Sequence, residues 1–380
     1  MPLPALRGRA PAAVLCAAFM IVTGCRADPA RELAEARRLQ DTGHADQAMQ
    51  RVDAVLAKQP ALFDARLAKA SLVGALPGRE EEALGMLRQL AQAEPRRTGV
   101  HRAMGIILAR SGKFGPAVNQ FEKELQIVPD DTLTLTELGM YYLRTGQWEQ
   151  AEDRLRRATS NGRGDARAYR NLAEVSFHNG KTEDGLAQQR EALKLAPDDA
   201  DLLVTHARAL LAYGHAEEGT ALLEDGAKRL NDAAIPAERA RQARESLDYD
   251  GAVAAYKKAL ELDPKRATTF LELGKTYLLM GRRDEARAAF ESGHDLSPSD
   301  PYPYFYLGTM DADDGHLDPA IDNLRKSLEL DPINPKAHYA LGQAFQRAGR
   351  RAEAQAEFAL HAQMLERLRG SRVSGTSTLD

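Results

Sequence analysis

Prolines recur along this chain at a fixed spacing. Pro264, Pro298 and Pro332 lie 34 residues apart, and Pro129 and Pro197 are separated by twice that distance. A unit of this length is one supersecondary element that cannot bury its apolar face alone, so several copies must stack on one another. The period therefore predicts a solenoid without a single central core, and it overrides the two or three domains that 380 residues would otherwise suggest.

The unit at residues 267–300 shows what each copy contains. Its large apolar residues fall into two sets with helical spacing, Phe270, Leu273 and Tyr277, then Ala286, Phe290 and Leu296. Gly281 lies between the two sets and can adopt the left-handed conformation that ends a helix. Gly274 and Ala286 leave room for two helices to cross closely. Each unit is therefore predicted to be a pair of helices.

The same register recurs in other units. It appears at Leu135, Leu138, Gly139, Tyr142, Gly146, Ala151 and Leu155, at Tyr304, Leu307, Gly308, Gly315, Ala320, Leu324 and Pro332, and at His338, Leu341, Gly342, Phe345, Gly349, Ala354 and Phe358. This pattern resembles the tetratricopeptide repeat family. The resemblance implies an all-α, right-handed superhelical solenoid of about ten helical hairpins, beginning near residues 29, 64, 98, 132, 166, 200, 233, 267, 301 and 335. It also implies protein or peptide partners that bind in the concave groove lined by the first helix of each hairpin.

The N-terminal segment is predicted to be an export signal. Arg7 and Arg9 precede an apolar run to about Val22, which is too short to span a bilayer. The residues that end at Cys25, VTGC, resemble the lipobox of bacterial lipoproteins, which implies cleavage before Cys25 and acylation of this residue. The alternative is a plain secretory signal with an incidental cysteine. Several acyl chains on one residue suffice for a stable membrane anchor.

The residue after Cys25 indicates which membrane the lipoprotein is anchored in. Arg26 stands where, by the same resemblance, an aspartate is associated with retention in the inner membrane. We therefore expect a periplasm-facing lipoprotein, with the outer membrane favoured.

The predicted domains follow from these features. They are a signal peptide at 1–24, an acylated cysteine and short tether at 25–29, repeats one to six at 30–233, repeats seven to ten with a C-terminal capping helix at 234–369, and a disordered tail at 370–380. The seventh repeat is unusual because its first helix is polar nearly all round and carries Arg239 where a leucine normally packs. Weaker packing predicts a kink or a flexible joint near 230–248.

No catalytic signature is found, and the sequence predicts no cofactor and no metal site. The two cysteines, Cys16 and Cys25, precede the predicted repeats, and P-loop, nucleophile-elbow and zinc-protease motifs are absent. The net charge of −4 argues against a nucleic-acid partner. His101 and His338 are interpreted as hydrogen-bonded core residues rather than metal ligands. The acidic run at 311–315 is interpreted as a polar turn with capping acids rather than a calcium site.

Arginines dominate the groove positions of repeats three to six. The family pattern places there Arg102, Arg110, Arg144, Arg167, Arg170 and Arg208. A basic strip within a net-acidic protein predicts acidic partners. The alternative is that these arginines pair with acids on adjoining loops and merely keep the groove soluble.

A second candidate site comes from the ninth and tenth repeats. The groove positions there carry Tyr302, Phe305, Lys336, Tyr339, Gln343 and Arg347. Aromatic anchors with a basic rim suit an extended peptide. The alternative is that the aromatic side chains pack between repeats. The asparagine that the chaperone-binding branch of the family uses to clamp a carboxylate is absent from these positions, which disfavours an adaptor of cytosolic chaperones.

These features favour a membrane-anchored scaffold that mediates protein–protein interactions in a cell-envelope machine, such as pilus assembly, secretion, polysaccharide export or a cell-wall complex. One alternative is a soluble, co-chaperone-like adaptor whose N-terminus has another role. Another is an enzyme whose repeats guide the substrate, although ten repeats leave no room in these 380 residues for a catalytic domain.

Overall fold

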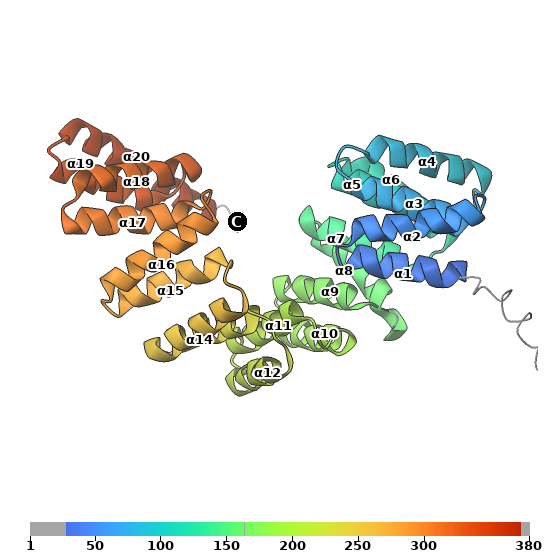
Figure 1. The fold of residues 1–380 in the computed structure, drawn as a ribbon, viewed down its shortest axis with the longest axis horizontal. Coiled ribbons are helices and arrows are strands. Elements are labelled where there is room, and N and C mark those ends of the chain that lie inside the picture. Colours follow the sequence, from blue (N-terminus) through green and yellow to red (C-terminus); the bar gives the residue numbers. More distant parts are fainter. Residues whose placement is uncertain (1–27, 163, 374–380) are drawn as a thin grey trace, which may run out of the picture. The chain divides into compact units, whose positions relative to one another are not determined.

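A computed structural model describes residues 28–162 and 164–373 (Figure 1). In this part of the chain all regular structure is helical, with 20 α-helices and one short 3-10 helix and no strand. The helices group into two compact units that divide between Asn179 and Gly180.

The first unit consists of four helical hairpins and one further helix, in which consecutive helices pack on each other. Its elements are α1 (Pro29–Asp41), α2 (Ala45–Lys58), α3 (Phe63–Ala75), α4 (Glu80–Ala93), α5 (Val100–Arg110), α6 (Phe114–Ile127), α7 (Thr132–Arg144), α8 (Trp148–Thr159), the 3-10 helix η1 (Ser160–Gly162) and α9 (Ala166–His178).

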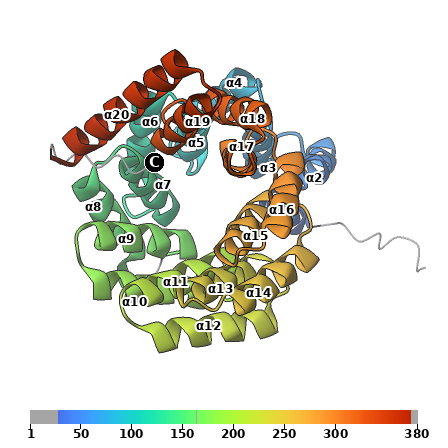
Figure 2. The same ribbon diagram turned by 90° about the vertical axis from the view of Figure 1, so that its left-hand side faces the viewer.

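The second unit consists of one helix followed by five hairpins. Its elements are α10 (Thr182–Leu195), α11 (Ala200–Ala212), α12 (Ala216–Arg229), α13 (Ala234–Glu245), α14 (Tyr249–Leu262), α15 (Ala267–Leu279), α16 (Arg283–Leu296), α17 (Pro301–Asp314), α18 (Leu317–Leu330), α19 (Pro335–Arg347) and α20 (Arg351–Val373). With 23 residues, α20 is longer than the helix it packs on, and Figure 2 shows it as the long red helix beside α19.

In several hairpins a large side chain of the second helix lies against a glycine of the first. A Cβ atom on Gly274 of α15 would lie 2.6 Å from the ring of Phe290 on α16, closer than side chains can approach. Phe290 is fully buried as a result. The same arrangement recurs between Gly342 and Phe358. Glycine at this place therefore sets how closely the two helices can pack.

Most turns inside the hairpins contain a residue with positive φ. Gly281 has φ of 72° at the end of α15, and Gly315 has φ of 85° at the end of α17. The turn between α13 and α14 differs because Leu247 occupies this place, with φ of 64° and an exposed side chain. A left-handed conformation costs a residue with a Cβ atom about 1–2 kcal/mol, so this turn is strained where the others are not.

A buried carboxylate completes the start of α5. Gly99 precedes this helix and has no side chain that could cap it. Instead, Glu124 of α6 is fully buried and accepts hydrogen bonds from the backbone N–H groups of Gly99 and Arg102. One helix of this hairpin thus supplies the N-terminal cap of the other.

The prediction of an all-α fold built from consecutive helical hairpins is confirmed. The predicted disordered tail began too early, because α20 continues to Val373 and takes in residues 370–373. Gly370 did not end this helix, since a single glycine lowers helix stability by only about 1 kcal/mol. Residues 374–380 lie outside the described part of the chain, as does Cys25 with the predicted signal.

The segment predicted to bend near 230–248 forms α13. Arg239 is exposed rather than packed, while Ile235 and Ala240 of the same helix are fully buried. The division between the two compact units falls at residue 179, not in this segment. The flexibility expected there stays a prediction.

Candidate partner-binding groove

Helices α17 and α19 of the second unit pack on each other and carry the exposed aromatic residues of the candidate site. Asp300 caps α17 by accepting a hydrogen bond from the N–H group of Tyr302 at 2.9 Å, and Pro301 is the first helical residue. Asn334 caps α19 in the same way, with Pro335 as its first residue. These local signals fix where each helix begins, and therefore which side chains face outward.

The aromatic side chains predicted for this site divide into two exposed rings and one packed ring. Tyr302 is 47% exposed and Tyr339 is 46% exposed. Phe305, in contrast, is half-buried against the apolar cluster that contains Leu341 of α19. Tyr339 also contacts the ring of Phe358, with centroids 5.7 Å apart. The packing alternative therefore describes Phe305, while both tyrosines remain accessible.

The polar residues of the site form one stripe along α19. Lys336, Tyr339, Gln343 and Arg347 follow each other at intervals of three or four residues and are all exposed. Among the residues that the structure describes, neither Lys336 nor Arg347 has an ion-pair partner, and Gln343 makes no side-chain hydrogen bond. This surface, Tyr302 with the four residues of α19, is named the α17–α19 face below.

The arginines predicted as a basic strip lie in both units. Arg102, Arg110, Arg144, Arg167 and Arg170 belong to the first unit, and Arg208 to the second. Three of them have acidic partners: Arg102 with Asp131 at 2.7 Å, Arg167 with Glu137 at 3.2 Å, and Arg208 with Glu238 at 2.7 Å. The alternative of pairing with nearby acids thus describes half of the set.

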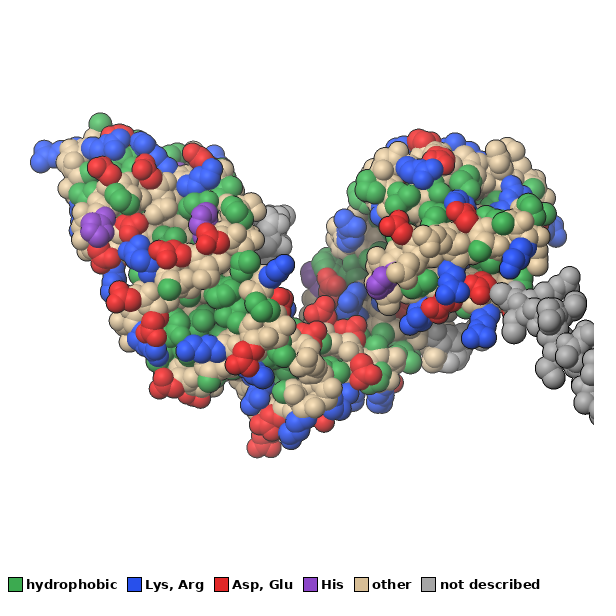
Figure 3. Space-filling model, viewed as in Figure 1, with side chains coloured by type: hydrophobic (Ala, Val, Ile, Leu, Met, Phe, Trp, Pro, Cys, Tyr) green, Lys and Arg blue, Asp and Glu red, His purple; other side chains and the backbone are tan. Residues whose placement is uncertain are grey.

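The other three arginines have no acidic partner in the described part of the chain. Arg110 donates to the backbone carbonyl of Ala75 at 3.2 Å, and Arg144 lies over the ring of Phe114 at 5.9 Å from its centroid. Arg170 is exposed. On the face drawn in Figure 3, basic and acidic side chains are interspersed on both units rather than separated.

The acid beside Arg102 is held in its charged form. Burial by itself raises the pKa of Asp131, but hydrogen bonds from Thr134 and the charge of Arg102 outweigh this effect and leave the pKa below its ordinary value. Asp131 also caps α7 through the N–H group of Thr134 at 3.0 Å. Arg102 is thus bound to a structural carboxylate and is a weak candidate for partner binding.

Glu238 is the acid that the sequence interpretation missed. Its carboxylate is buried, with 3% exposure, and it pairs with both Arg208 and Arg241. Burial raises its pKa, but hydrogen bonds from Arg241 and Arg208 outweigh burial and lower the pKa overall. The sequence does contain a signal for this pair: Glu238 lies 30 residues after Arg208, near the start of the first helix of the following hairpin. Asp131 lies in a similar place, 29 residues after Arg102.

Three histidines are placed as follows. His338 bonds Glu357 at 2.6 Å and the carbonyl of Pro332 at 3.1 Å, and His101 bonds Gln120 at 2.8 Å, as the sequence predicted. Burial lowers the pKa of His206 to about 4, so this side chain is neutral at pH 7.

The acidic run at 311–315 is held by arginines of the preceding hairpin. Asp311 pairs with Arg287 at 2.8 Å, and Asp314 pairs with Arg283 at 2.7 Å. Gly315 ends α17. Within residues 28–162 and 164–373, no group of three or more His, Cys, Asp and Glu side chains is arranged to hold a metal ion, and no helix has the length and apolarity needed to cross a membrane.

Models of known protein families match most of the helical hairpins described above. Models of the tetratricopeptide repeat match residues 136–200 and 267–300, and a TPR repeat model matches 245–281 and 308–349. The model of the N-terminal TPR repeats region of Psidin matches residues 33–154. The chain belongs to the tetratricopeptide repeat family. Its fold is that of a protein–protein interaction scaffold, whose partners are proteins or peptides.

Curated relatives are similar in sequence to parts of this tetratricopeptide repeat protein. It is 24% identical over 255 residues to the protein CTR9 homolog of Arabidopsis thaliana, which covers 63% of this chain and 23% of the relative. It is 26% identical over 162 residues to the human protein O-mannosyl-transferase TMTC1, covering 42% and 18%. It is 29% identical over 167 residues to cellulose synthase operon protein C of Pseudomonas fluorescens, covering 42% and 13%. The chain thus spans less than a quarter of the length of each.

Proposed function

We propose that this chain is a membrane-anchored scaffold of a bacterial cell envelope and that it binds an extended segment of a partner protein along the α17–α19 face. The observation that carries the proposal is the pair of exposed tyrosines, Tyr302 and Tyr339, on two helices that pack on each other. Large rigid rings exposed on a well-folded surface are the side chains that contribute most to binding energy.

The partner segment is expected to be acidic. Lys336 and Arg347 lie on either side of Tyr339 along α19, and no acid of the described chain neutralises them. A carboxylate placed beside each would form a charge-assisted hydrogen bond without breaking an existing ion pair. The arginines of the first unit contribute less to this proposal, because Arg102 and Arg167 already have acidic partners.

The anchor rests on the sequence around Cys25. A lipobox-like VTGC after an apolar run supports lipidation, and Arg26 supports the outer membrane with the repeats facing the periplasm. The similarity to a protein of a cellulose synthase operon favours polysaccharide export among the possible envelope machines. The runner-up is a soluble adaptor.

We also propose that the chain has no catalytic activity of its own. The pairing of buried acids with arginines, as in Glu238 with Arg208 and Arg241, leaves these groups committed to structure. The matched part of the O-mannosyl-transferase TMTC1 covers 18% of that protein, so its activity does not transfer with the similarity.

The groove is tested by crosslinking in intact cells followed by affinity capture. The double variant Tyr302→Ala/Tyr339→Ala is expected to lose the partner that the unmodified chain recovers, while its helical content is unchanged. The matched control is Ile333→Ala, which removes another exposed apolar side chain, 71% accessible, from the turn before α19. Equal recovery by the double variant would remove the α17–α19 face from consideration.

The anchor is tested separately by replacing Cys25 with serine and fractionating cells. The unmodified protein is expected in the membrane fraction, and the Cys25→Ser variant in the soluble fraction. A soluble distribution of both proteins would reject the lipid anchor in favour of the soluble adaptor.

A further inference from the structure

In the second hairpin, two positions that hold apolar or ring side chains in other hairpins carry basic side chains. In six first helices the fourth and seventh residues are apolar, aromatic or histidine: Leu135 and Leu138, Tyr169 and Leu172, Leu203 and His206, Phe270 and Leu273, Tyr304 and Leu307, His338 and Leu341. In α3, which begins at Phe63, the same places hold Arg66 and Lys69. A long cation keeps its charged end near water and does not fill a core site as a ring does.

In four of these six helices the fourth residue carries a ring. Tyr304 donates to the carbonyl of Pro298 at 3.3 Å, and a ring nitrogen of His338 bonds the carbonyl of Pro332 at 3.1 Å. Pro60 stands six residues before Arg66, as each of these prolines stands six residues before its ring. Arg66 makes no such hydrogen bond, and a cavity of about 270 Å³ lies beside Pro60 instead.

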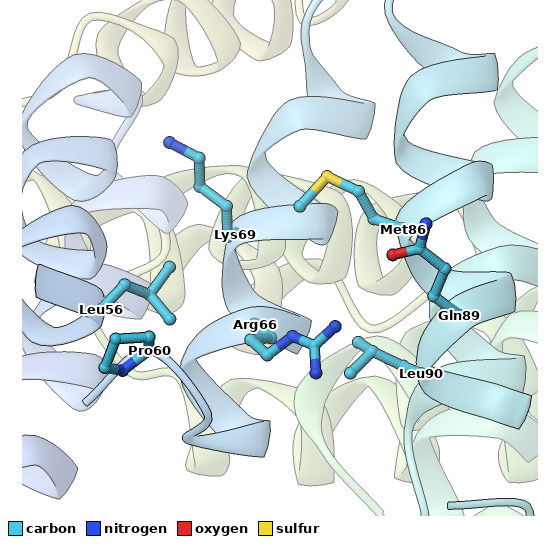
Figure 4. Close-up of a pocket in the computed structure, with 7 residues that line it drawn as sticks. All are labelled: Leu56, Pro60, Arg66, Lys69, Met86, Gln89 and Leu90. Carbon is cyan, nitrogen blue, oxygen red and sulfur yellow. The ribbon is translucent and has the colours of Figure 1, made fainter. Parts of the chain in front are cut away.

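The walls of this cavity are mostly apolar. They come from α2, the connection after it, α3 and α4, and consist of Leu56, Pro60, Met86 and Leu90 with Arg66, Lys69 and Gln89. Figure 4 shows Leu56 and Pro60 on one side and Met86, Gln89 and Leu90 on the other, with Arg66 between them. Pockets for drug-sized ligands occupy about 300–1,000 Å³, so this cavity suits a single side chain.

The two cations of the cavity differ in their partners. The ammonium of Lys69 lies 2.6 Å and 2.8 Å from the two carboxylate oxygens of Asp53, so its charge is compensated. Arg66 is half-buried, and its guanidinium has neither an ion pair nor a hydrogen bond with any described residue. In Figure 4 this guanidinium points toward Leu90, inside the apolar walls, while Lys69 points away from it. An uncompensated guanidinium in this setting favours a carboxylate, which it can bind with two parallel hydrogen bonds.

We propose that this cavity binds the C-terminal residue of a partner peptide, with the terminal carboxylate on Arg66 and an aliphatic or aromatic side chain in the space that Tyr304 and His338 fill in their own hairpins. The Gln89 side-chain amide is placed at the rim to bond the last peptide group. The site lies in the first unit and does not depend on the α17–α19 face of the second. The commitment to a peptide end, rather than to an acyl chain, follows from Gln89, whose amide can bond a peptide group and has no counterpart to bond in an acyl chain.

The test measures binding of a fluorescent tetrapeptide, Gly-Ser-Gly-Leu, to the full chain. The peptide with a free C-terminal carboxylate is expected to bind at least about ten-fold more tightly than the same peptide as its C-terminal amide, since an ionised acceptor roughly doubles the strength of the hydrogen bonds. Arg66→Met is expected to reduce the affinity of the free acid to that of the amide. Equal binding of acid and amide to the unmodified chain would overturn the proposal.

A second variant distinguishes a loss of binding from a loss of folding. Arg66→Tyr restores the ring found at Tyr169 and Tyr304, so it is expected to raise the melting temperature and to abolish peptide binding by filling the cavity. Arg88→Met removes an exposed cation of α4 and is the matched control, expected to bind as the unmodified chain does. Undiminished binding to Arg66→Tyr, an equal loss with Arg88→Met, or competition by octanoate at the concentration of the peptide would each refute a C-terminal peptide site.

Discussion

Two neighbouring hairpins of the second unit reach the same fold by different means. In α15–α16, Gly274 lets the ring of Phe290 approach closely and Gly281 makes the turn. In α13–α14, an alanine, Ala240, stands at the place of Gly274, and Leu247 makes the turn with φ of 64°. The first helix α13 is held by Glu238 between two arginines.

The difference shows that a repeat does not need a full apolar stripe. Glu238 replaces part of the missing apolar contact with a buried carboxylate, whose desolvation cost is offset only while both arginine partners remain. In α15–α16 the carboxylate of Glu272 also pairs with two cations, Lys275 and Arg244, but it is only partly buried. The hairpin α13–α14 is therefore expected to respond more strongly than α15–α16 to substitutions of charged residues and to pH.

The largest effect is expected from removing both arginines that surround Glu238. The variant Arg208→Met/Arg241→Met leaves a buried carboxylate without compensation, which costs about 3–5 kcal/mol. Hydrogen exchange of the α13 amides is expected to accelerate accordingly. Adding Glu238→Leu should recover most of the loss. The matched control in the other hairpin, Arg282→Met, breaks an exposed pair with Glu285 and is expected to have little effect on stability.

The next effect concerns the close approach in α15–α16. Gly274→Val places side-chain atoms where the ring of Phe290 lies, and overpacking of this kind costs about 1–3 kcal/mol. The reciprocal change Ala240→Gly in α13 removes a methyl group and adds backbone freedom, with a loss of about 1 kcal/mol. Urea unfolding measures both. A smaller loss for Gly274→Val than for Ala240→Gly would contradict the role assigned to Gly274.

A weaker effect is expected on acidification. Because the folded pKa of Glu238 is lowered, the unfolded chain binds the proton more readily. The contribution of Glu238 to stability is therefore present above its ordinary pKa of 4.5 and is lost as the pH falls through the lower folded value. Melting temperatures measured from pH 7 to pH 3 should fall more steeply for the unmodified chain than for Glu238→Gln. Parallel curves would show that Glu238 does not titrate with folding.

The smallest effect is expected at the turns. Leu247→Gly relieves a left-handed leucine and should raise stability by about 1 kcal/mol, while Gly281→Leu introduces the same strain and should lower it by about 1–2 kcal/mol. Thermal unfolding of the two variants checks both signs. A loss of stability in Leu247→Gly would mean that the exposed leucine makes a stabilising contact.

The regular hairpins could be predicted closely from the sequence. The spacing of Phe270, Leu273 and Tyr277 and the place of Gly281 are local properties, so they fix each helix and each turn without knowledge of the neighbours. The paired helices α15–α16, α17–α18 and α19–α20 follow from this pattern. The exposure of Tyr302 and Tyr339 agrees with their predicted register, but the same register did not reveal that Phe305 packs against the apolar cluster of α19.

The second hairpin was predicted near residue 64, but its exact register was not, because the turn between its two helices is one residue longer. Four residues, 76–79, connect α3 to α4, whereas three residues, 280–282, connect α15 to α16. If the repeat is taken to begin at residue 64, the predicted register is correct for α4. In α3 it is wrong by one residue, so Arg66 and Lys69 are not assigned to core positions. The cavity beside Pro60 was therefore not visible as a departure from the repeat.

Ion pairs between hairpins could not be predicted from the sequence either. Arg102 and Asp131, or Arg208 and Glu238, are separated by about one repeat, and many acids lie at similar distances along the chain. Which acid an arginine reaches depends on side-chain rotamers and on the crossing of two helices. The sequence alone therefore could not decide between a free basic strip and paired arginines.

The carboxylate of Glu124 has a consequence for rebuilding this protein from parts. Because α6 supplies the cap of α5, the boundary of α5 is encoded in its partner and not in its own residues. Transplanting α5 alone into another array would carry over a helix with an unfinished beginning. The smallest interchangeable module in this region is the complete α5–α6 pair.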